Sequence, residues 1–446
     1  MPNNKNASLS KIHRYSWVSL LVCWLIWVLN AFDREIVLRL GPVITKQFDL
    51  SPDAWGQIAT IVLIALSVLA IPGSIWSDRY GSGWKRAKFQ VPLLIGYTAL
   101  SFVTGFKAIS QSLTTFVALR VGANLGSGWA EPVGVSNTAE WWPVERRGFA
   151  LGAHHTGYPV GALLSGLTAS LVITMFGEDN WRYVFFVPFV VAVPLMLFWS
   201  KYSTADKIAT LYADIASKNM TPPSVVTETN VQKGQAWRAL KATLANRTIT
   251  LTAANTMFAQ AAYMGVNIVL PAYLYNIVGL SLAESAGMSV VFTITGILGQ
   301  LLWPSLSDLI GRKITLVICG IWMAVSIAAF YFASSITSIV VIQLFFGLVA
   351  NAVWPIFYAV ASDSAEPGAT STANGVITTA LFLGGGLAPV VMGTLIGLGG
   401  GWHTLTGYVI CFFFMAGCAL AGVVLQLCTS SRTAAHREVE LAEPSV

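Results

Sequence analysis

Long apolar runs alternate with short polar segments along almost the whole of this 446-residue chain. Each run approaches the roughly 20 apolar residues that an α-helix needs to cross a bilayer. A mixed polar stretch over 201–248 separates six such runs from six more. The pattern predicts twelve transmembrane helices, near residues 15–40, 54–77, 88–106, 109–138, 146–175, 182–200, 249–277, 284–306, 313–334, 337–362, 370–398 and 404–428.

The composition supports an all-α membrane protein. Charged residues make up 10% of the chain, against about 25% in soluble domains, and the mean hydropathy is +0.66. We interpret the net charge of +6 as basic loops at a bilayer surface rather than as a nucleic-acid site. The five cysteines lie in apolar runs without metal-ligand or disulfide spacing, so we expect neither a metal nor a cofactor.

Lysine and arginine residues gather in alternate segments between the predicted helices. They precede the first helix and follow the second, fourth, sixth, eighth and twelfth, whereas the opposite side has Lys46, Lys107 and Arg182. Cytoplasmic loops carry the excess of basic residues. We therefore expect a multi-pass protein of the inner (plasma) membrane, monomeric, with both termini and the central loop in the cytoplasm.

The two halves of the chain resemble each other. Ser77 to Gly81 follows the second helix, and a similar segment, Ser307 to Gly311, follows the eighth, 230 positions later. A duplicated six-helix unit is typical of transporters that rock one half against the other. We predict an N-terminal six-helix bundle over 1–200, a cytoplasmic linker over 201–248 with a short amphipathic helix at 232–243, a C-terminal six-helix bundle over 249–430 and a tail over 431–446.

The repeated segments carry an acid, a base and a glycine. Glycine permits the positive φ of a tight reversal, and a carboxylate there can cap a helix or pair with a base. Such a contact can break and re-form as the halves move, although a plain cap and turn would use the same residues. We assign a gating role to Asp78, Arg79, Gly81, Asp308, Gly311 and Arg312.

Ionisable residues inside predicted spans are the candidate functional groups, because each costs free energy in the bilayer. Arginine stays charged and offers a planar fork to a carboxylate, and substrate binding there can release a neighbouring acid to take a proton. A structural ion pair between Asp33 and either Arg34 or Arg120 is the alternative. The charges lie in the first half, at Asp33, Arg34, Arg120, Glu131, His154 and His155.

Histidine titrates near neutrality and can relay protons, but it also packs as a hydrogen-bonded core residue. Adjacent helical residues point about 100° apart, so at most one of His154 and His155 is expected to face a cavity, and we assign His155 to proton coupling. The second half offers neutral polar and aromatic groups instead. We assign substrate contacts to Tyr158 in the first half and to Tyr263, Asn351 and Trp354 in the second, with packing as the alternative role.

Several motifs resemble a known family. Ser74 to Gly81, followed by Lys85 and Arg86, resembles the loop 2–3 signature of the major facilitator superfamily. Asn30 to Arg34 resembles the Asn-x-x-Asp-Arg of helix one in its anion:cation symporter family, and Glu140 to Pro143 resembles that family's Glu-Trp-Phe-Pro loop. The resemblance implies two pseudo-symmetric six-helix halves and proton-driven uptake of an organic anion.

The same resemblance implies roles for individual residues. The helix-one acid, here Asp33, would be a proton site, and Arg34 and Arg120 would hold the substrate carboxylate. The family places a second acid seven residues after the helix-four arginine, where this chain has Ser127. Glu131 follows one helical turn later and is the candidate replacement.

We therefore predict a secondary active transporter, in which a small organic anion (a carboxylate, a sugar acid or a related compound) enters with a proton by alternating access. The alternatives are an antiporter or efflux pump of the same fold and a non-transporting membrane protein such as a sensor. No Gly-x-x-x-x-Gly-Lys-Ser/Thr phosphate loop occurs in the sequence, which argues against ATP-driven transport. No arrangement of a nucleophile and a base suggests an enzyme.

Overall fold

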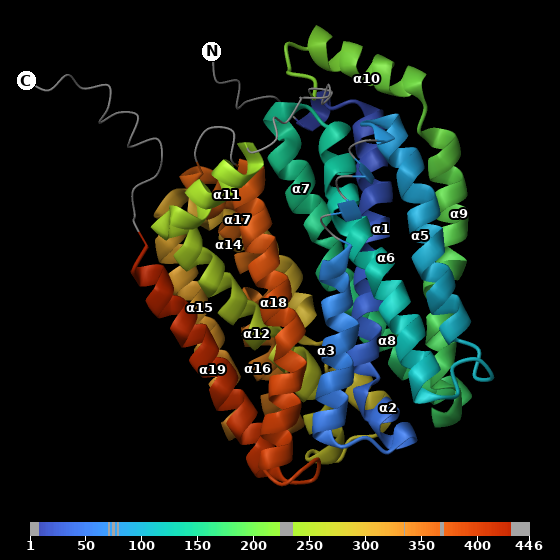
Figure 1. Ribbon diagram of the computed structural model, residues 1–446, viewed down its shortest axis with the longest axis vertical. Coiled ribbons are helices and arrows are strands. Elements are labelled where there is room, and N and C mark those ends of the chain that lie inside the picture. The colour runs from blue at the N-terminus through green and yellow to red at the C-terminus, as the bar shows by residue number, and fades with distance from the viewer. Residues whose placement is uncertain are drawn as a thin grey trace, which may run out of the picture. The chain divides into compact units, whose positions relative to one another are not determined.

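The computed structural model describes residues 9–69, 72–73, 76–77, 80–223, 235–333, 335–365 and 370–429. Within these residues the regular structure is entirely helical (Figure 1). The chain divides into two compact units. Unit 1 comprises Met1–Leu50, Ile61–Thr229 and Val278–Val290, and unit 2 comprises Ser51–Thr60, Asn230–Ile277 and Val291–Val446.

Unit 1 is a bundle around the first helix. Its elements are α1 (Arg14–Arg39), α2 (Gly41–Phe48), α5 (Trp84–Thr104), α6 (Leu113–Glu140), α7 (Arg147–His155), α8 (Gly157–Phe176), the 3₁₀ helix η3 (Glu178–Phe185), α9 (Phe186–Tyr202), α10 (Ala205–Ser217) and the short α13 (Leu282–Met288). The first helix packs against α8 and α6, and α5 packs against α6 and α9. Short 3₁₀ turns, η1 (Leu9–Lys11) and η2 (Val144–Arg146), precede α1 and α7.

Unit 2 is organised around a long helix. Its elements are α11 (Gln235–Ala245), α12 (Arg247–Asn276), α14 (Phe292–Ile310), α15 (Arg312–Ala328), η4 (Ala329–Phe332), α16 (Ile336–Ala350), α17 (Val353–Ser364), α18 (Thr370–Leu398) and α19 (Leu405–Leu427). The long α12 packs against α18 and α19. The helix α3 (Pro52–Val68) contributes its first residues to this unit, where the hydroxyl of Thr60 accepts a hydrogen bond from Val390 N at 3.0 Å.

Nine helical stretches in the described part of the chain are long and apolar enough to cross a membrane, and α3 is a shorter apolar helix. The predicted spans near 88–106 and 109–138 form α5 and α6, helices of 21 and 28 residues. These two helices are less apolar than the nine stretches, because they carry polar groups on their buried faces. In α6 these groups include Arg120, Asn124 and Asn137.

The sequence predicts one continuous helix over 146–175, and the structure divides it into α7 and α8 at Thr156. The Thr156 hydroxyl donates to Ala153 O at 2.7 Å and accepts from Trp24 Nε1 at 3.0 Å. Just after this division, a Cβ added at Gly161 would lie 2.3 Å from Val28 O. The absence of a side chain at Gly161 thus lets the backbone of α8 approach α1 closely.

The linker region holds one helix that the sequence analysis missed. The predicted helix at 232–243 corresponds to α11, but α10 was not predicted, although Leu211 and Ile215 have helical spacing. These two side chains are buried in the core of unit 1. Between them, the Tyr212 hydroxyl donates to Glu140 O at 3.0 Å, and burial raises the pKa of Tyr212 to about 12.

Candidate functional site

Three consecutive charged residues near the end of α1 build the site. Asp33, Arg34 and Glu35 are 0%, 7% and 1% exposed. Successive side chains of an α-helix point about 100° apart, so each residue meets a different neighbour. In the structure Asp33 meets α5 and α6, Arg34 meets α6, and Glu35 meets α8.

Asp33 and Arg120 form an ion pair that is closed to solvent. Arg120 Nη2 lies 3.0 Å from Asp33 Oδ2, and both side chains are 0% exposed. Ser101 bridges the pair, because its hydroxyl donates to Asp33 Oδ1 and accepts from Arg120 Nη1 at 2.6 Å. The guanidinium also lies 4.9 Å from the ring centroid of Phe185. Two of the predicted residues therefore occupy one fully buried contact.

Arg34 and Glu131 form a second pair that is more open. Arg34 Nη1 lies 2.8 Å from Glu131 Oε2, and the Glu131 side chain is 23% exposed. Arg34 also donates from Nε to Ser127 Oγ at 2.9 Å and from Nη2 to Ser127 O at 3.0 Å. Ser127 and Glu131 are four residues apart, on one face of α6. Glu131 lies one helical turn beyond the position of the family's helix-four acid, and it still contacts the guanidinium of Arg34.

Glu35, Arg39 and Tyr158 form a third contact, in which two of the residues were not predicted. Glu35 Oε2 lies 2.5 Å from Arg39 Nη2, and the Tyr158 hydroxyl donates to Glu35 Oε1 at 2.6 Å. The acid and base are spaced i and i+4 on α1, which is the spacing of a helical ion pair. That spacing inside an apolar run was the signal that could have identified them.

Both histidines lie against Trp27. His154 stacks on the indole with ring centroids 5.7 Å apart, and His155 meets its edge at 6.1 Å. His154 is 1% exposed and its Nδ1 lies 3.2 Å from the hydroxyl of Thr138. His155 is half-buried. The same Trp27 ring lies 5.4 Å from the guanidinium carbon of Arg34.

The predicted substrate contacts of the second half lie together in unit 2. Tyr263 meets Trp354 edge to face with ring centroids 5.9 Å apart. Asn351 lies between α16 and α17, three residues before Trp354, and is 0% exposed. Among the described residues, neither amide atom of Asn351 has a hydrogen-bond partner. This region of unit 2 is therefore neutral, polar and aromatic.

The predicted gating segments are described in part. Asp78 and Arg79 and the side chain of Asp308 lie outside the described residues. Gly81 and Gly311 have φ of 126° and 95°, which is the left-handed backbone that favours glycine.

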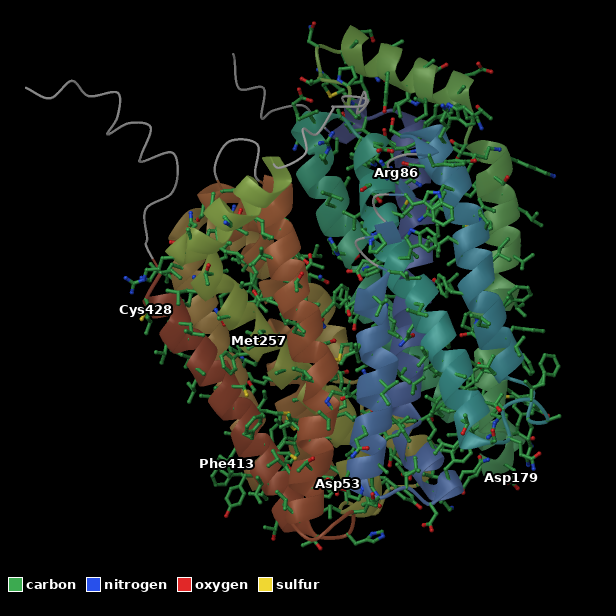
Figure 2. All side chains as sticks on the ribbon, in the orientation of Figure 1. Asp53, Arg86, Asp179, Met257, Phe413 and Cys428 are labelled. Carbon is green, nitrogen blue, oxygen red and sulfur yellow. The ribbon has the colours of Figure 1, made fainter. Side chains whose placement is uncertain are left out.

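A serine, an arginine and an acid meet near each glycine. Arg86, at the start of α5 (Figure 2), donates to Glu140 Oε1 at 2.9 Å and to Ser77 Oγ at 2.8 Å. In unit 2, Arg312 lies 3.3 Å from Asp363 Oδ2 and donates to Ser307 Oγ at 2.7 Å. The two turns thus share a serine, an arginine and an acid, although both acids and both arginines lie outside the repeated segments. Arg86 and Glu140 were not among the predicted gating residues.

Comparison with known proteins places these features in a family. The model of the Major Facilitator Superfamily matches residues 23–259 and 252–445. The cis,cis-muconate transport protein of Acinetobacter baylyi is 26% identical over 401 residues, which cover 88% of this chain and 92% of that protein. The hexuronate transporter of Bacillus subtilis is 22% identical, with 84% and 87% covered.

Among solved structures, the chain resembles an inward open conformation of the xylose transporter XylE from E. coli. The TM-score is 0.70 at 15% sequence identity, and the likeness covers 96% of this chain and 100% of that one. At this identity the likeness concerns the fold.

Proposed function

This chain belongs to the Major Facilitator Superfamily, and from that premise we propose that it takes up a small organic anion together with a proton. Membership confirms the predicted fold of twelve transmembrane helices in two six-helix halves. The protein is a multi-pass membrane transporter and not an enzyme. Two of its relatives are named for muconate and hexuronate, which are organic acids, and this supports an anionic substrate.

The Arg34–Glu131 contact is the observation that carries the proposal. A guanidinium presents parallel N–H donors that match a carboxylate, and Glu131 occupies that position in the described structure. An incoming organic anion would replace Glu131 on Arg34. The displaced carboxylate would then lose its counter-charge in a largely buried site, where a charged group is costly, and would take up a proton.

The Asp33–Arg120 pair has a different place in this proposal. Its atoms are fully buried and joined by Ser101, so an anion reaches Arg120 only after this contact opens. We assign the coupled proton to Glu131. Asp33 is the alternative acceptor of that same proton, in a conformation that separates it from Arg120. Alternating access between such conformations would carry the anion and proton across together.

We place the protein in the inner membrane with both termini in the cytoplasm, acting as a monomer. The concentration of basic residues in alternate loops supports this orientation. Cysteine introduced at the exposed Lys85, between the second and third predicted spans, should react with a membrane-impermeant thiol reagent only in permeabilised cells, whereas cysteine at the exposed Lys107 should react in intact cells.

Uptake by the purified protein tests the function. Organic acids that raise its thermal stability would be chosen first, and the best would be supplied to proteoliposomes under an imposed pH gradient. We expect accumulation above the external concentration only with acid outside, and loss of accumulation with a protonophore. Uptake that ignores the gradient would exclude symport and favour exchange or efflux.

A further inference from the structure

Glu35 is a buried carboxylate that the proposed function does not use. Its partner Arg39 is 0% exposed and Glu35 itself is 1% exposed. Burying such a pair carries a large desolvation cost, and ionisable residues inside a membrane protein are functional candidates. The contact also includes Tyr158, a residue of another helix, at 2.6 Å from Glu35 Oε1.

Unit 1 contains three ion pairs close to one turn of α1. We call their members the charged cluster: Asp33, Arg34, Glu35, Arg39, Arg120 and Glu131. Three acids and three bases give the cluster a formal charge of zero. An anion that enters with one proton keeps this balance, because Glu131 becomes neutral as the anion arrives. An anion of charge −2 needs a second proton acceptor.

The structure distinguishes the two remaining acids. Asp33 accepts hydrogen bonds from the Ser101 hydroxyl and the Arg120 guanidinium, and all three side chains are fully buried. Glu35 accepts one hydrogen bond from Arg39 of its own helix and one from Tyr158 of α8. Tyr158 is only half-buried. Among the side chains that donate to these two acids, Tyr158 is therefore the most exposed.

Tyr158 also lies next to the anion site. Its ring centroid is 5.9 Å from that of Trp27, and the guanidinium carbon of Arg34 is 5.4 Å from the same indole. Arg34 and Tyr158 thus both contact Trp27. The Tyr158 hydroxyl is therefore the donor that we assign to a second carboxylate of a ligand held by Arg34.

Other ionisable groups on helices packed against α1 have partners of their own. Glu284 of α13 is held in the capping box of Ser281, and Lys46 of α2 pairs with Glu178. The groups that the neighbouring helices bring toward this part of α1 are Tyr97 from α5, Arg120 and Glu131 from α6, His154 and His155 from α7, and Tyr158 from α8.

We infer that Glu35 is a second proton-binding site and that the transporter accepts a dicarboxylate together with two protons; this inference rests on the proposed function. One substrate carboxylate takes Arg34 while Glu131 takes a proton. The other substrate carboxylate accepts a hydrogen bond from the Tyr158 hydroxyl. Glu35 then keeps only its contact with Arg39 and takes the second proton. Two negative charges and two protons enter from the acidic side, so transport of the dianion is electroneutral.

Reversal-potential measurements in proteoliposomes test the proton ratio. The probes are succinate, fumarate and cis,cis-muconate, with benzoate as the monocarboxylate. We expect the wild-type protein to move two protons with a dicarboxylate and one with benzoate. Glu35→Gln should reduce the dicarboxylate ratio to one, so that its uptake becomes electrogenic, and the benzoate ratio should stay at one. Glu178→Gln, which removes an exposed acid, should change neither ratio.

Tyr158→Phe is a second test variant, needed if Glu35→Gln fails to fold. It removes the hydroxyl but keeps the Glu35–Arg39 pair. We expect its KM for dicarboxylates to rise about tenfold, the effect of losing one hydrogen bond to a charged group, with a much smaller change for benzoate. A wild-type ratio of one for dicarboxylates, or an unchanged ratio in Glu35→Gln, would overturn the inference while leaving symport intact. No gradient-driven uptake of any acid would overturn the proposed function itself.

Discussion

At the scale of single residues, the charged cluster forms three ion pairs, of which the sequence indicated only the pairing of Asp33 with an arginine, as an alternative. Asp33, Arg34, Arg120 and Glu131 stood out because a charge inside an apolar run is costly. Their partners depend on how α1 is rotated against α5, α6 and α8, which an apolar run with a weak polar face does not determine. Glu35 was overlooked because it directly follows the Asp-Arg motif.

The guanidinium of Arg34 gives the first prediction. It donates hydrogen bonds to the Ser127 hydroxyl, the Ser127 carbonyl and Glu131 at the same time. The ammonium of lysine is a point charge that cannot reproduce this planar arrangement of donors. Arg34→Lys should therefore weaken substrate binding about tenfold to a hundredfold, in line with the loss of one charge-assisted hydrogen bond, while the protein still folds. Titration of the purified variant with the best substrate checks this, and unchanged affinity would remove Arg34 from the anion site.

The two ion pairs should differ in their effect on stability. Asp33→Asn leaves Arg120 buried without its counter-charge, and breaking a buried pair in this way costs about 3–5 kcal/mol. Glu131→Gln should cost clearly less, because that side chain reaches solvent. Thermal unfolding of both variants in one detergent gives the comparison. Equal losses would show that the exposure of Glu131 does not lessen its structural role.

At the scale of elements, the positions of the long apolar helices could be predicted, and their divisions could not. The separation of α7 from α8 depends on the hydrogen bonds of Thr156 to Ala153 and Trp24, and Trp24 lies far away in the sequence. The helix α10 was missed because its apolar residues lie within a stretch that is polar overall. Local composition outweighed helical spacing in that prediction.

The close contact of α1 with α8 gives a prediction at this scale. A Cβ at Gly161 would lie 2.3 Å from Val28 O, whereas one at Gly152 of α7 would meet nothing within 4 Å. Gly161→Ala should destabilise the protein by about 1–3 kcal/mol through overpacking and should move Tyr158 relative to Glu35. Gly152→Ala is the matched control and should be neutral or slightly stabilising. Similar thermal stability of the two variants would contradict the described approach of the helices.

At the scale of the whole molecule, the distribution of charge is the main feature that the sequence predicted. No Lys or Arg occurs over 248–311 or over 314–431, and the ion pairs of the charged cluster all belong to unit 1. Unit 2 supplies neutral groups such as Asn351. Ser51–Thr60 belongs to unit 2 and Val278–Val290 to unit 1. This assignment could not be predicted, because it depends on contacts between segments far apart in the sequence.

The central claim is that an anion and Glu131 compete for Arg34, and that this exchange couples the proton to transport. The most direct test compares accumulation with counterflow in proteoliposomes containing Glu131→Gln, with Glu178→Gln as the control. We predict that Glu131→Gln exchanges labelled benzoate across the membrane but reaches only the external concentration under a pH gradient, whereas the control accumulates it. Normal gradient-driven accumulation by Glu131→Gln would contradict this account.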